Sequence, residues 1–219
     1  MTLRSFISKI QKELKTKEGT KETVHKDMRK AIRLSKQAIL LTHQKRLKDA
    51  RKLLNEADEL FMKLHKVAKM HPGLVYTGIV DAAMQEYAEA QTLLALVEKN
   101  HFISPETLNI PAVPYVLGLA DVIGELRRQA LDALRAGDTK EAEHCLQVME
   151  QIYVQLTSMN EAYMLVPGLR RKCDVARRII EATRGDVTIE ARRDSLEQSI
   201  RKLEKTLGRR RKVGESRKA

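Results

Sequence analysis

The chain contains few of the residues that support disulfides, metal fingers or sheets. Of its 219 residues none is Trp and 4% are aromatic, and there are two Cys, five Pro and ten Gly. Cys145 and Cys173 stand apart without a CxxC or Cys/His spacing, so we expect reduced core residues and no catalytic thiol. The abundance of Ala, Leu, Lys, Arg, Glu and Gln predicts an all-α protein.

Long apolar runs are also missing. None approaches the roughly 20 residues needed to span a bilayer, which excludes membrane insertion. The opening segment TLRSFISKIQKELK alternates charged and apolar residues at helical spacing and lacks a signal-peptide core and cleavage site. We therefore expect an intracellular, cytoplasmic protein.

Charge divides the chain into three parts. The whole carries +12, whereas residues 1–72 carry +11, residues 73–166 carry −8 and residues 167–219 carry +9. Basic segments attract a phosphate backbone, and an acidic centre suits a metal-dependent enzyme acting on a phosphodiester polymer. The alternative is that these charge runs are solvated helix faces without a function.

The spacing of apolar residues predicts a succession of helices, without a repeat of fixed period that would indicate a solenoid. Thr20 or Thr23 is the expected N-cap of a helix ending near residue 41, with a shorter helix before it. The other expected helices are 45–69, 74–98, a short one capped by Ser104, 115–136, one capped by Asp138 and ending near residue 163, 170–183 and 189–207, with a turn at Gly185-Asp186.

Four carboxylates interrupt apolar helical stretches. Glu86 and Glu89 in QEYAEA form an i,i+3 pair, and Asp121 and Glu125 in LADVIGELRR form an i,i+4 pair, so each pair projects from one helix face. Buried carboxylates repel one another and lose hydration, which protons, basic partners or a metal ion offset. Oxygen ligands from two helices suit Mg²⁺ or Mn²⁺, although pairing with basic residues is the structural alternative.

Other kinds of site find less support. A di-iron bundle normally supplies Glu-x-x-His motifs, but Glu86 is followed at i+3 by Glu89, and Glu125 by Arg128. No HExxH, Cys/His zinc spacing, P-loop or GxGxxG element is present, and no His lies five residues after an Arg. We expect surface or packing roles for the six histidines, which are His25, His43, His65, His71, His101 and His144.

Three segments stand out, namely QEYAEAQTLLALVE, PYVLGLADVIGELRRQALDALRAGD and RRKCDVARRIIEATRGD. They resemble the translin superfamily, and within it the translin-associated factor X branch, and the resemblance spans about residues 20–187. The ADxxGEL pattern of the catalytic branch is present at residues 120–126, and its QEYxEA pattern at residues 85–90. Translin proper lacks the aspartate that this chain has as Asp121.

The resemblance implies a fold, an assembly and an activity. It implies a translin-like bundle of about seven helices that forms a closed homo-oligomer, which we expect to be an octameric ring or barrel. It places Glu86, Glu89, Asp121 and Glu125 on the metal-binding catalytic acids of a Mg²⁺-dependent endoribonuclease, with Mn²⁺ as a substitute. Water would attack the phosphodiester, and no protein nucleophile is needed.

Arg128 lies on the same helix face as Asp121 and Glu125, at i+7 and i+3. It is a candidate to bind a substrate phosphate, and a salt bridge to the carboxylates is the alternative. The basic and aromatic cluster that translin uses for nucleic acid is absent, since the chain reads GLVYTGIVD there. We expect a helical domain at 1–187, an additional helix at 188–208 and a basic disordered tail at 209–219, for which the resemblance gives no counterpart.

Two functions remain open. The first is a metal-dependent endoribonuclease acting on single-stranded or partly structured RNA. The second is a non-catalytic oligomeric scaffold that binds single-stranded RNA or DNA through the basic segments. Loss of cleavage without loss of binding, on changing Glu89 or Asp121, would separate them.

Overall fold

All regular elements in the described part of the chain are helices. The computed structural model describes residues 2–75, 77–159, 161 and 163–216, with side chains through residue 206. The all-α prediction with about seven helices is confirmed. The elements are α1 (Leu3–His43), α2 (Leu47–Met70), the 3₁₀ helix η1 (Pro72–Leu74), α3 (Gly78–Lys99), α4 (Pro105–Leu108), α5 (Ala112–Arg135), α6 (Thr139–Thr157) and α7 (Leu169–Ser216).

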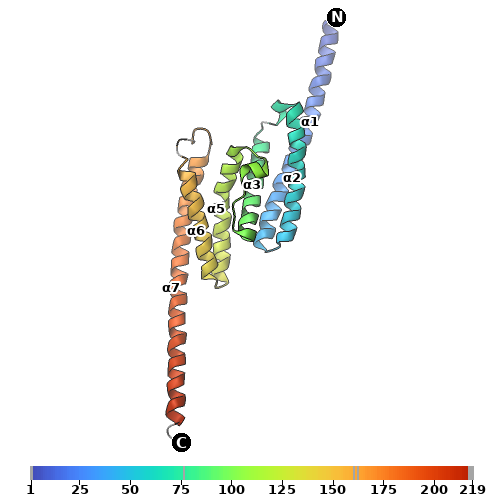
Figure 1. The fold of residues 1–219 in the computed structure, drawn as a ribbon. Coiled ribbons are helices and arrows are strands. Elements are labelled where there is room, and N and C mark those ends of the chain that lie inside the picture. Colours follow the sequence, from blue (N-terminus) through green and yellow to red (C-terminus); the bar gives the residue numbers. More distant parts are fainter. Residues whose placement is uncertain (1, 76, 160, 162, 217–219) are drawn as a thin grey trace.

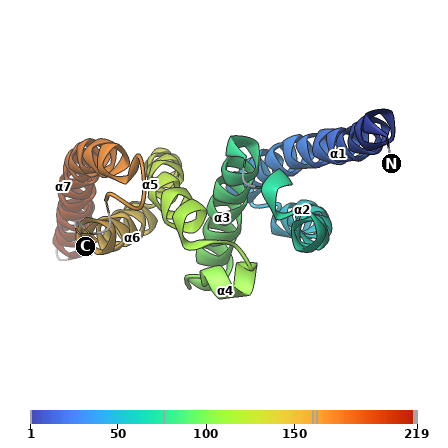
Figure 2. The ribbon, with the colours of Figure 1, turned by 90° about the horizontal axis from the view of Figure 1, so that it is seen from above.

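The long helices form two groups that meet through α3 and α5. On one side α1 packs against α2 and α3, and on the other α5 packs against α6 and α7, which also contact each other. Figure 2 shows the two groups next to one another, with α3 and α5 in the middle. The helices that carry the four carboxylates therefore occupy the junction between the two halves.

The first helix is continuous, so the expected N-cap at Thr20 or Thr23 is wrong. The hydroxyls of both threonines donate to carbonyls one turn earlier, at Thr16 (3.0 Å) and Gly19 (2.9 Å), instead of capping a new helix. Gly19 lowers helix propensity by only about 1 kcal/mol. The helix therefore passes through this segment.

The last helix is continuous as well, so the expected turn at Gly185-Asp186 is wrong. Thr183 and Val187 are both buried on either side of it, which keeps α7 packed across the glycine. Asp186 pairs with Arg127 of α5, with 3.3 Å between nitrogen and oxygen. The expected separate helix 188–208 is the distal part of α7, which is assigned as helix to Ser216; the disordered tail expected at 209–219 stays a prediction, and residues 217–219 lie outside the described residues.

Several local predictions are confirmed. Ser104 and Asp138 act as N-caps, accepting from the backbone N–H of Thr107 (3.3 Å) and Glu141 (3.0 Å). Gly137 has a φ of 78°, which a glycine C′ position favours. Three boundaries differ, because Leu74 lies in η1 and α3 begins at residue 78, α5 begins before Pro114, and α6 ends at residue 157.

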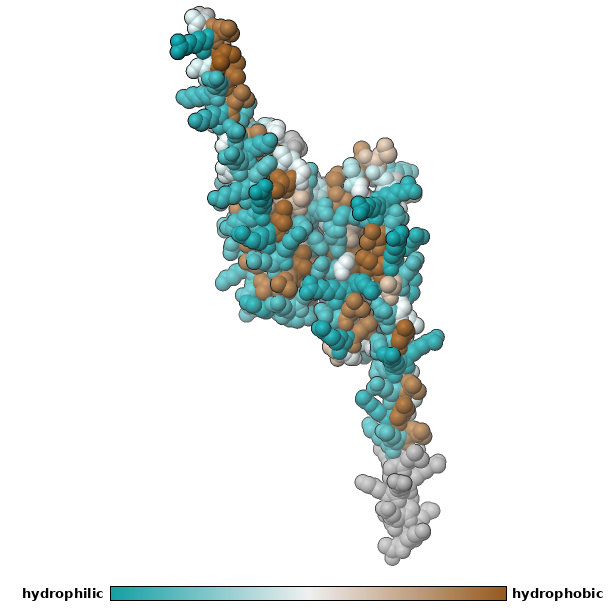
Figure 3. Space-filling model, turned by 180° about the vertical axis from the view of Figure 1, so that it is seen from behind, coloured by the Kyte–Doolittle hydropathy of each residue, from teal (hydrophilic) through white to brown (hydrophobic). Residues whose placement is uncertain are grey.

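Both ends of the chain project from the body as helical arms (Figure 1). We define the N-terminal arm as residues 3–18 and the C-terminal arm as residues 188–206; the first buried side chain of α1 is Val24 and the last of α7 is Val187. Each arm carries a stripe of exposed apolar residues, visible in Figure 3. The stripes comprise Leu3, Phe6, Ile7, Ile10 and Leu14 on the first arm, and Ile189, Leu196, Ile200 and Leu203 on the second.

Candidate functional site

The site is built around a close approach of α5 to α3. A Cβ added at Gly118 would lie 2.5 Å from the carbonyl oxygen of Gln85 and 2.9 Å from the Cβ of Ala88. Only a glycine allows the two helices to come so near, and the small Ala88 helps on the other side. This contact brings the QEYAEA segment of α3 beside the ADVIGEL segment of α5.

Asp121 receives two donors from different helices. The Nε2 of Gln85 on α3 donates to one carboxylate oxygen over 2.6 Å. The other oxygen forms an ion pair with Lys172 of α7. The side chains of Lys172 and Asp121 are 29% and 30% exposed, so the pair is open to solvent on one side.

The N-terminal helix supplies bases to two more carboxylates. Lys36 of α1 lies 3.3 Å from Glu86. His43, the last residue of α1, places its Nε2 2.5 Å from Glu125, and its own side chain is 5% exposed. The hydrogen bond from His43 lowers the pKa of Glu125, burial opposes this, and the charges of His43 and Arg128 lower it further.

Glu89 is the most buried member of the cluster, with a relative exposure of 8%. Burial raises its pKa to about 8, and the charges of Asp121, Glu86 and Glu125 raise it in turn, whereas Lys172 lowers it. The cluster is therefore compact enough for every other acid to act on Glu89. Its carboxyl group is largely protonated at neutral pH unless a cation approaches.

The four acids fit Mg²⁺ or Mn²⁺ by their chemistry, since both metals take carboxylate oxygens and retain waters. The repulsion on Glu89 is the kind that a cation relieves. Within the described residues, however, no group of three or more His, Cys, Asp and Glu side chains is placed to hold a metal ion. Asp121, Glu86 and Glu125 are each turned towards a basic partner. Coordination would require them to exchange those partners for the metal.

Arg128 is exposed and close enough to lower the pKa of Glu125 by its charge. The structure records no hydrogen bond or ion pair for it among the described side chains. Among these side chains Arg128 thus forms no recorded salt bridge with the carboxylates, and it acts on Glu125 only through its charge. Its guanidinium faces solvent beside the cluster.

Four residues of this site were not predicted from the sequence. Gln85 belongs to the QEYAEA motif, but the sequence indicated no function for it. Lys36 and Lys172 contributed only to the net charge of the basic segments. His43 was expected to be an ordinary histidine, but it is buried against Glu125. The one signal for Gln85 and Lys172 was their position within segments that carry the family resemblance.

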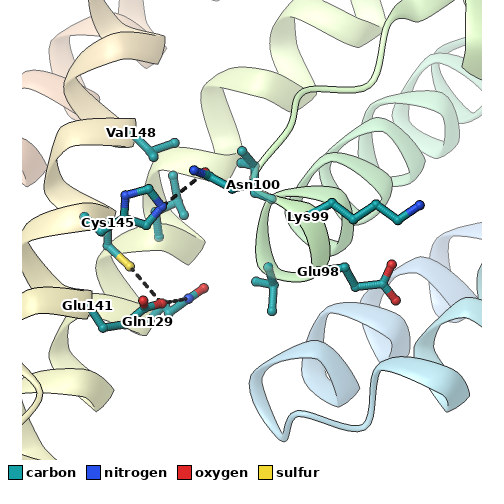
Figure 4. A pocket seen from close by; sticks show the side chains of 11 residues that line it. Glu98, Lys99, Asn100, Gln129, Glu141, Cys145 and Val148 are labelled. Carbon is teal, nitrogen blue, oxygen red and sulfur yellow. Dashed lines mark hydrogen bonds between the residues drawn. The ribbon is translucent and has the colours of Figure 1, made fainter.

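Away from the four acids, a cavity of about 390 Å³ lies where the end of α3 meets α5 and α6 (Figure 4). The thiol of Cys145 points there towards Glu141, which accepts from Gln129 over 2.6 Å. Burial and the charge of Glu141 raise the pKa of Cys145 to about 12, despite a smaller opposing effect of Lys45. Cys145 and Cys173 are both buried free thiols, as expected, and neither is a reactive thiolate.

No helix among the described residues is long and apolar enough to cross a membrane. This agrees with the absence of a long apolar run in the sequence.

One protein-family model covers most of the chain. The Translin family profile matches residues 3–207, beyond the 20–187 over which the resemblance was expected. An uncharacterised protein of Methanocaldococcus jannaschii is 33% identical over 193 residues, covering 87% of this chain and 85% of its own.

Solved structures agree in fold. A structure described as an AfC3PO–duplex RNA complex is 34% identical, with a TM-score of 0.77, covering 84% of this chain and 96% of its own. An apo-NeC3PO crystal structure is 24% identical, with a TM-score of 0.76, covering 87% and 98%, and it supports the fold alone.

Proposed function

The chain belongs to the translin family, and from this premise we propose that it is an oligomeric RNA-binding protein that cleaves RNA as a metal-dependent endoribonuclease. RNA binding is supported by the similar AfC3PO, whose structure is described as a complex with duplex RNA. The basic segments on either side of an acidic centre support the same conclusion. A cytoplasmic location stays a prediction from the sequence.

The observation that carries the nuclease proposal is the burial of Glu89 among three other acids. A folded protein gains no stability from a buried carboxyl with a pKa of about 8 beside like charges. Such arrangements are concentrated at functional sites. The family resemblance assigns a catalytic role to the same four positions, which are Glu86, Glu89, Asp121 and Glu125.

The residues of the site divide the chemical tasks. When bound by the four acids, Mg²⁺ or Mn²⁺ would polarise the phosphodiester and lower the pKa of a water. Glu89 holds a proton on its carboxyl at neutral pH and can release it when positive charge arrives. Gln85 orients Asp121 through its 2.6 Å hydrogen bond. Arg128 offers a guanidinium to a phosphate oxygen at the solvent side.

Assembly into a homo-oligomer is supported by the arms. The exposed side chains of Ile189, Leu196 and Leu203 are seven residues apart, and Leu3, Ile7, Ile10 and Leu14 follow a spacing of four, three and four. This is the heptad pattern of helices that pack against other helices. We propose that second copies of the chain cover these stripes, in a closed ring or barrel of eight chains.

A non-catalytic scaffold is the second candidate. Three of the four acids already have basic partners within the chain, namely Lys36, His43 and Lys172. If those pairs persist in the presence of metal, the cluster is structural and the basic surface alone acts on nucleic acid. Binding would then be salt-sensitive and only weakly sequence-specific.

The two candidates separate in one experiment. A labelled single-stranded RNA is incubated with the purified oligomer in Mg²⁺, Mn²⁺ or EDTA. We expect cleavage that requires metal and that falls by at least about 100-fold in Asp121→Ala, because removing one ligand of a catalytic metal commonly costs that much or more. Asp132→Ala is the matched control, since Asp132 lies on the same helix and its one recorded ion pair among the described side chains is with the exposed Arg135.

Thermal unfolding gives a readout independent of activity. Mg²⁺ should raise the unfolding temperature of the wild type and of Asp132→Ala, but not of Asp121→Ala, because ligands that bind the folded state stabilise it. RNA binding without cleavage in any metal, together with no effect of Mg²⁺ on unfolding, would establish the scaffold instead.

A further inference from the structure

A groove runs beside Asp121 between α5 and α7. Its volume is about 410 Å³. Asp121 and Gly124 line it from α5, Arg171 and Lys172 from the first turn of α7, and Gly168 from the residue before that helix. The groove thus opens directly onto one of the four acids, on the side that faces away from α3.

Gly124 keeps this groove open. A Cβ added there would meet no atom within 4 Å, in contrast to Gly118, where α3 lies in the way. Helix packing therefore does not require a glycine at position 124, although a glycine inside a helix costs roughly 0.5–1 kcal/mol relative to alanine. Gly124 lies one turn after Asp121, so its missing side chain leaves free space next to the carboxylate.

The charges that line the groove suit an anion. Arg171 is exposed, and among the described side chains no hydrogen bond or ion pair is recorded for it. Lys172 is paired with Asp121, which offsets the negative charge that would otherwise repel a phosphate. The remaining wall is apolar, formed by Ala120, Val175, Ala176 and Ile179.

We propose that this groove binds a backbone phosphate of the RNA strand next to the phosphate held at the four acids. Arg171 contacts the phosphate oxygens, and Gly124 leaves room for the strand. Lys172 screens Asp121 as long as no metal takes its place, and it lines the same groove as a second positive charge when the metal does. This inference rests on the proposed function, in which the protein binds RNA. It adds the path of the RNA strand, which runs from the four acids along the groove between α5 and α7.

The test measures binding without cleavage. Anisotropy of a fluorescein-labelled single-stranded RNA is recorded in EDTA for Gly124→Leu, which fills the groove, and for Arg171→Ala. We expect each to weaken binding about tenfold, the equivalent of roughly 1.4 kcal/mol. Arg171→Ala should also reduce the slope of log K against log salt by about 1, as the loss of one phosphate contact does.

Matched controls exist for both changes. Gly185→Leu introduces the same side chain into an exposed helical position of α7 that is equally open. Arg170→Ala removes the neighbouring exposed arginine, which does not line the groove. Both should bind RNA within about twofold of the wild type, well under the 1.4 kcal/mol of a tenfold change. If Gly124→Leu does not fold, RNA binding is measured with the smaller change Gly124→Ala instead.

The outcomes distinguish the groove from the nuclease. Wild-type affinity in both Gly124→Ala and Arg171→Ala would overturn the groove even if the protein cleaves RNA. Weakened binding in these variants would support the groove even if no metal gives cleavage, in which case only the nuclease proposal fails. A wild type that binds no RNA overturns both.

Discussion

The junction of α3 and α5 and the two arms satisfy their side chains in opposite ways. At the junction Glu89 is buried and the other three acids are partly buried, and Asp121, Glu86 and Glu125 each have a partner from a distant helix of the same chain. On the arms, apolar groups lie outside, and Leu196 is 62% and Leu14 59% exposed. The acids of the junction thus find partners within one chain, whereas the apolar side chains of the arms find none among the described residues of that chain.

This contrast indicates where each region finds its function. A charged cluster supported from α1, α3, α5 and α7 is held in place by the fold of one chain, so each chain brings the four acids together by itself. An apolar stripe with heptad spacing gains stability only when another helix covers it. The arms are therefore expected to govern assembly, and the junction to govern chemistry.

Breaking the C-terminal arm should have the largest effect. Leu196→Glu combined with Ile200→Glu places two charges on the stripe, and burial of each original side chain in an interface is worth about 1.5–3 kcal/mol. We expect light scattering at micromolar concentration to show a smaller species, with helicity of the body retained.

The control for this change adds the same charges elsewhere on the arm. Ser195→Glu with Gln198→Glu lies off the stripe and should leave the mass unchanged. An unchanged mass in the stripe variant would remove the arm from the assembly, and a wild type that is already monomeric would reject the proposed oligomer.

Breaking the junction should have the next largest effect. Gly118→Ala forces a Cβ to within 2.5 Å of the Gln85 carbonyl, and backbone atoms cannot move aside cheaply. Overpacking of this kind typically costs about 1–3 kcal/mol. We expect a lower urea midpoint of unfolding, whereas Gly19→Ala, at an open helical position, should raise it slightly. Equal midpoints for Gly118→Ala and wild type would mean that the helices do not approach so closely.

The helices of the junction were predictable from the sequence. The expected ranges 74–98 and 115–136 are close to α3 and α5, because apolar runs bounded by Pro and Gly are local signals. The four acids could be predicted as candidate site residues for the same reason, since the spacing within each pair, on α3 and on α5, is visible in the sequence. Their roles as metal ligands and catalytic acids stay predictions.

The rest depended on contacts between distant parts of the chain. His43 and Glu125 are 82 residues apart, and Lys172 and Asp121 are 51 apart, so no local pattern pairs them. The turn expected at Gly185-Asp186 was wrong for a similar reason, because the burial of Thr183 and Val187 against the body maintains the helix. At Gly185, tertiary packing overrode local propensity.

Titration of the junction should give a moderate effect with a defined sign. Glu89 keeps its proton up to about pH 8 in the folded chain but loses it near its ordinary value of 4.5 when unfolded. The free energy of unfolding should therefore fall as pH rises between these values, by at most about 1.4 kcal/mol per pH unit. The lowered pKa of Glu125 acts the other way, and only below its ordinary value.

Glu89→Gln should remove this part of the pH dependence. In urea unfolding at several pH values without metal, the wild type should lose stability relative to Glu89→Gln as pH rises from 5 to 8. Glu143→Gln on the exposed face of α6 is the control and should follow the wild type. A difference that stays constant across this range would mean that Glu89 is ionised throughout.

The smallest effect is expected where the body passes into the C-terminal arm. Gly185 is helical, exposed and open, with no atom within 4 Å of an added Cβ. Gly185→Ala should therefore stabilise the protein by roughly 0.5–1 kcal/mol, because alanine loses less backbone entropy in a helix. Urea unfolding measures this change. Destabilisation would indicate instead that Gly185 has a backbone conformation that alanine does not readily adopt. In that case the turn predicted from the sequence at Gly185-Asp186 would be present, and the C-terminal arm would not continue the helix that packs at the junction.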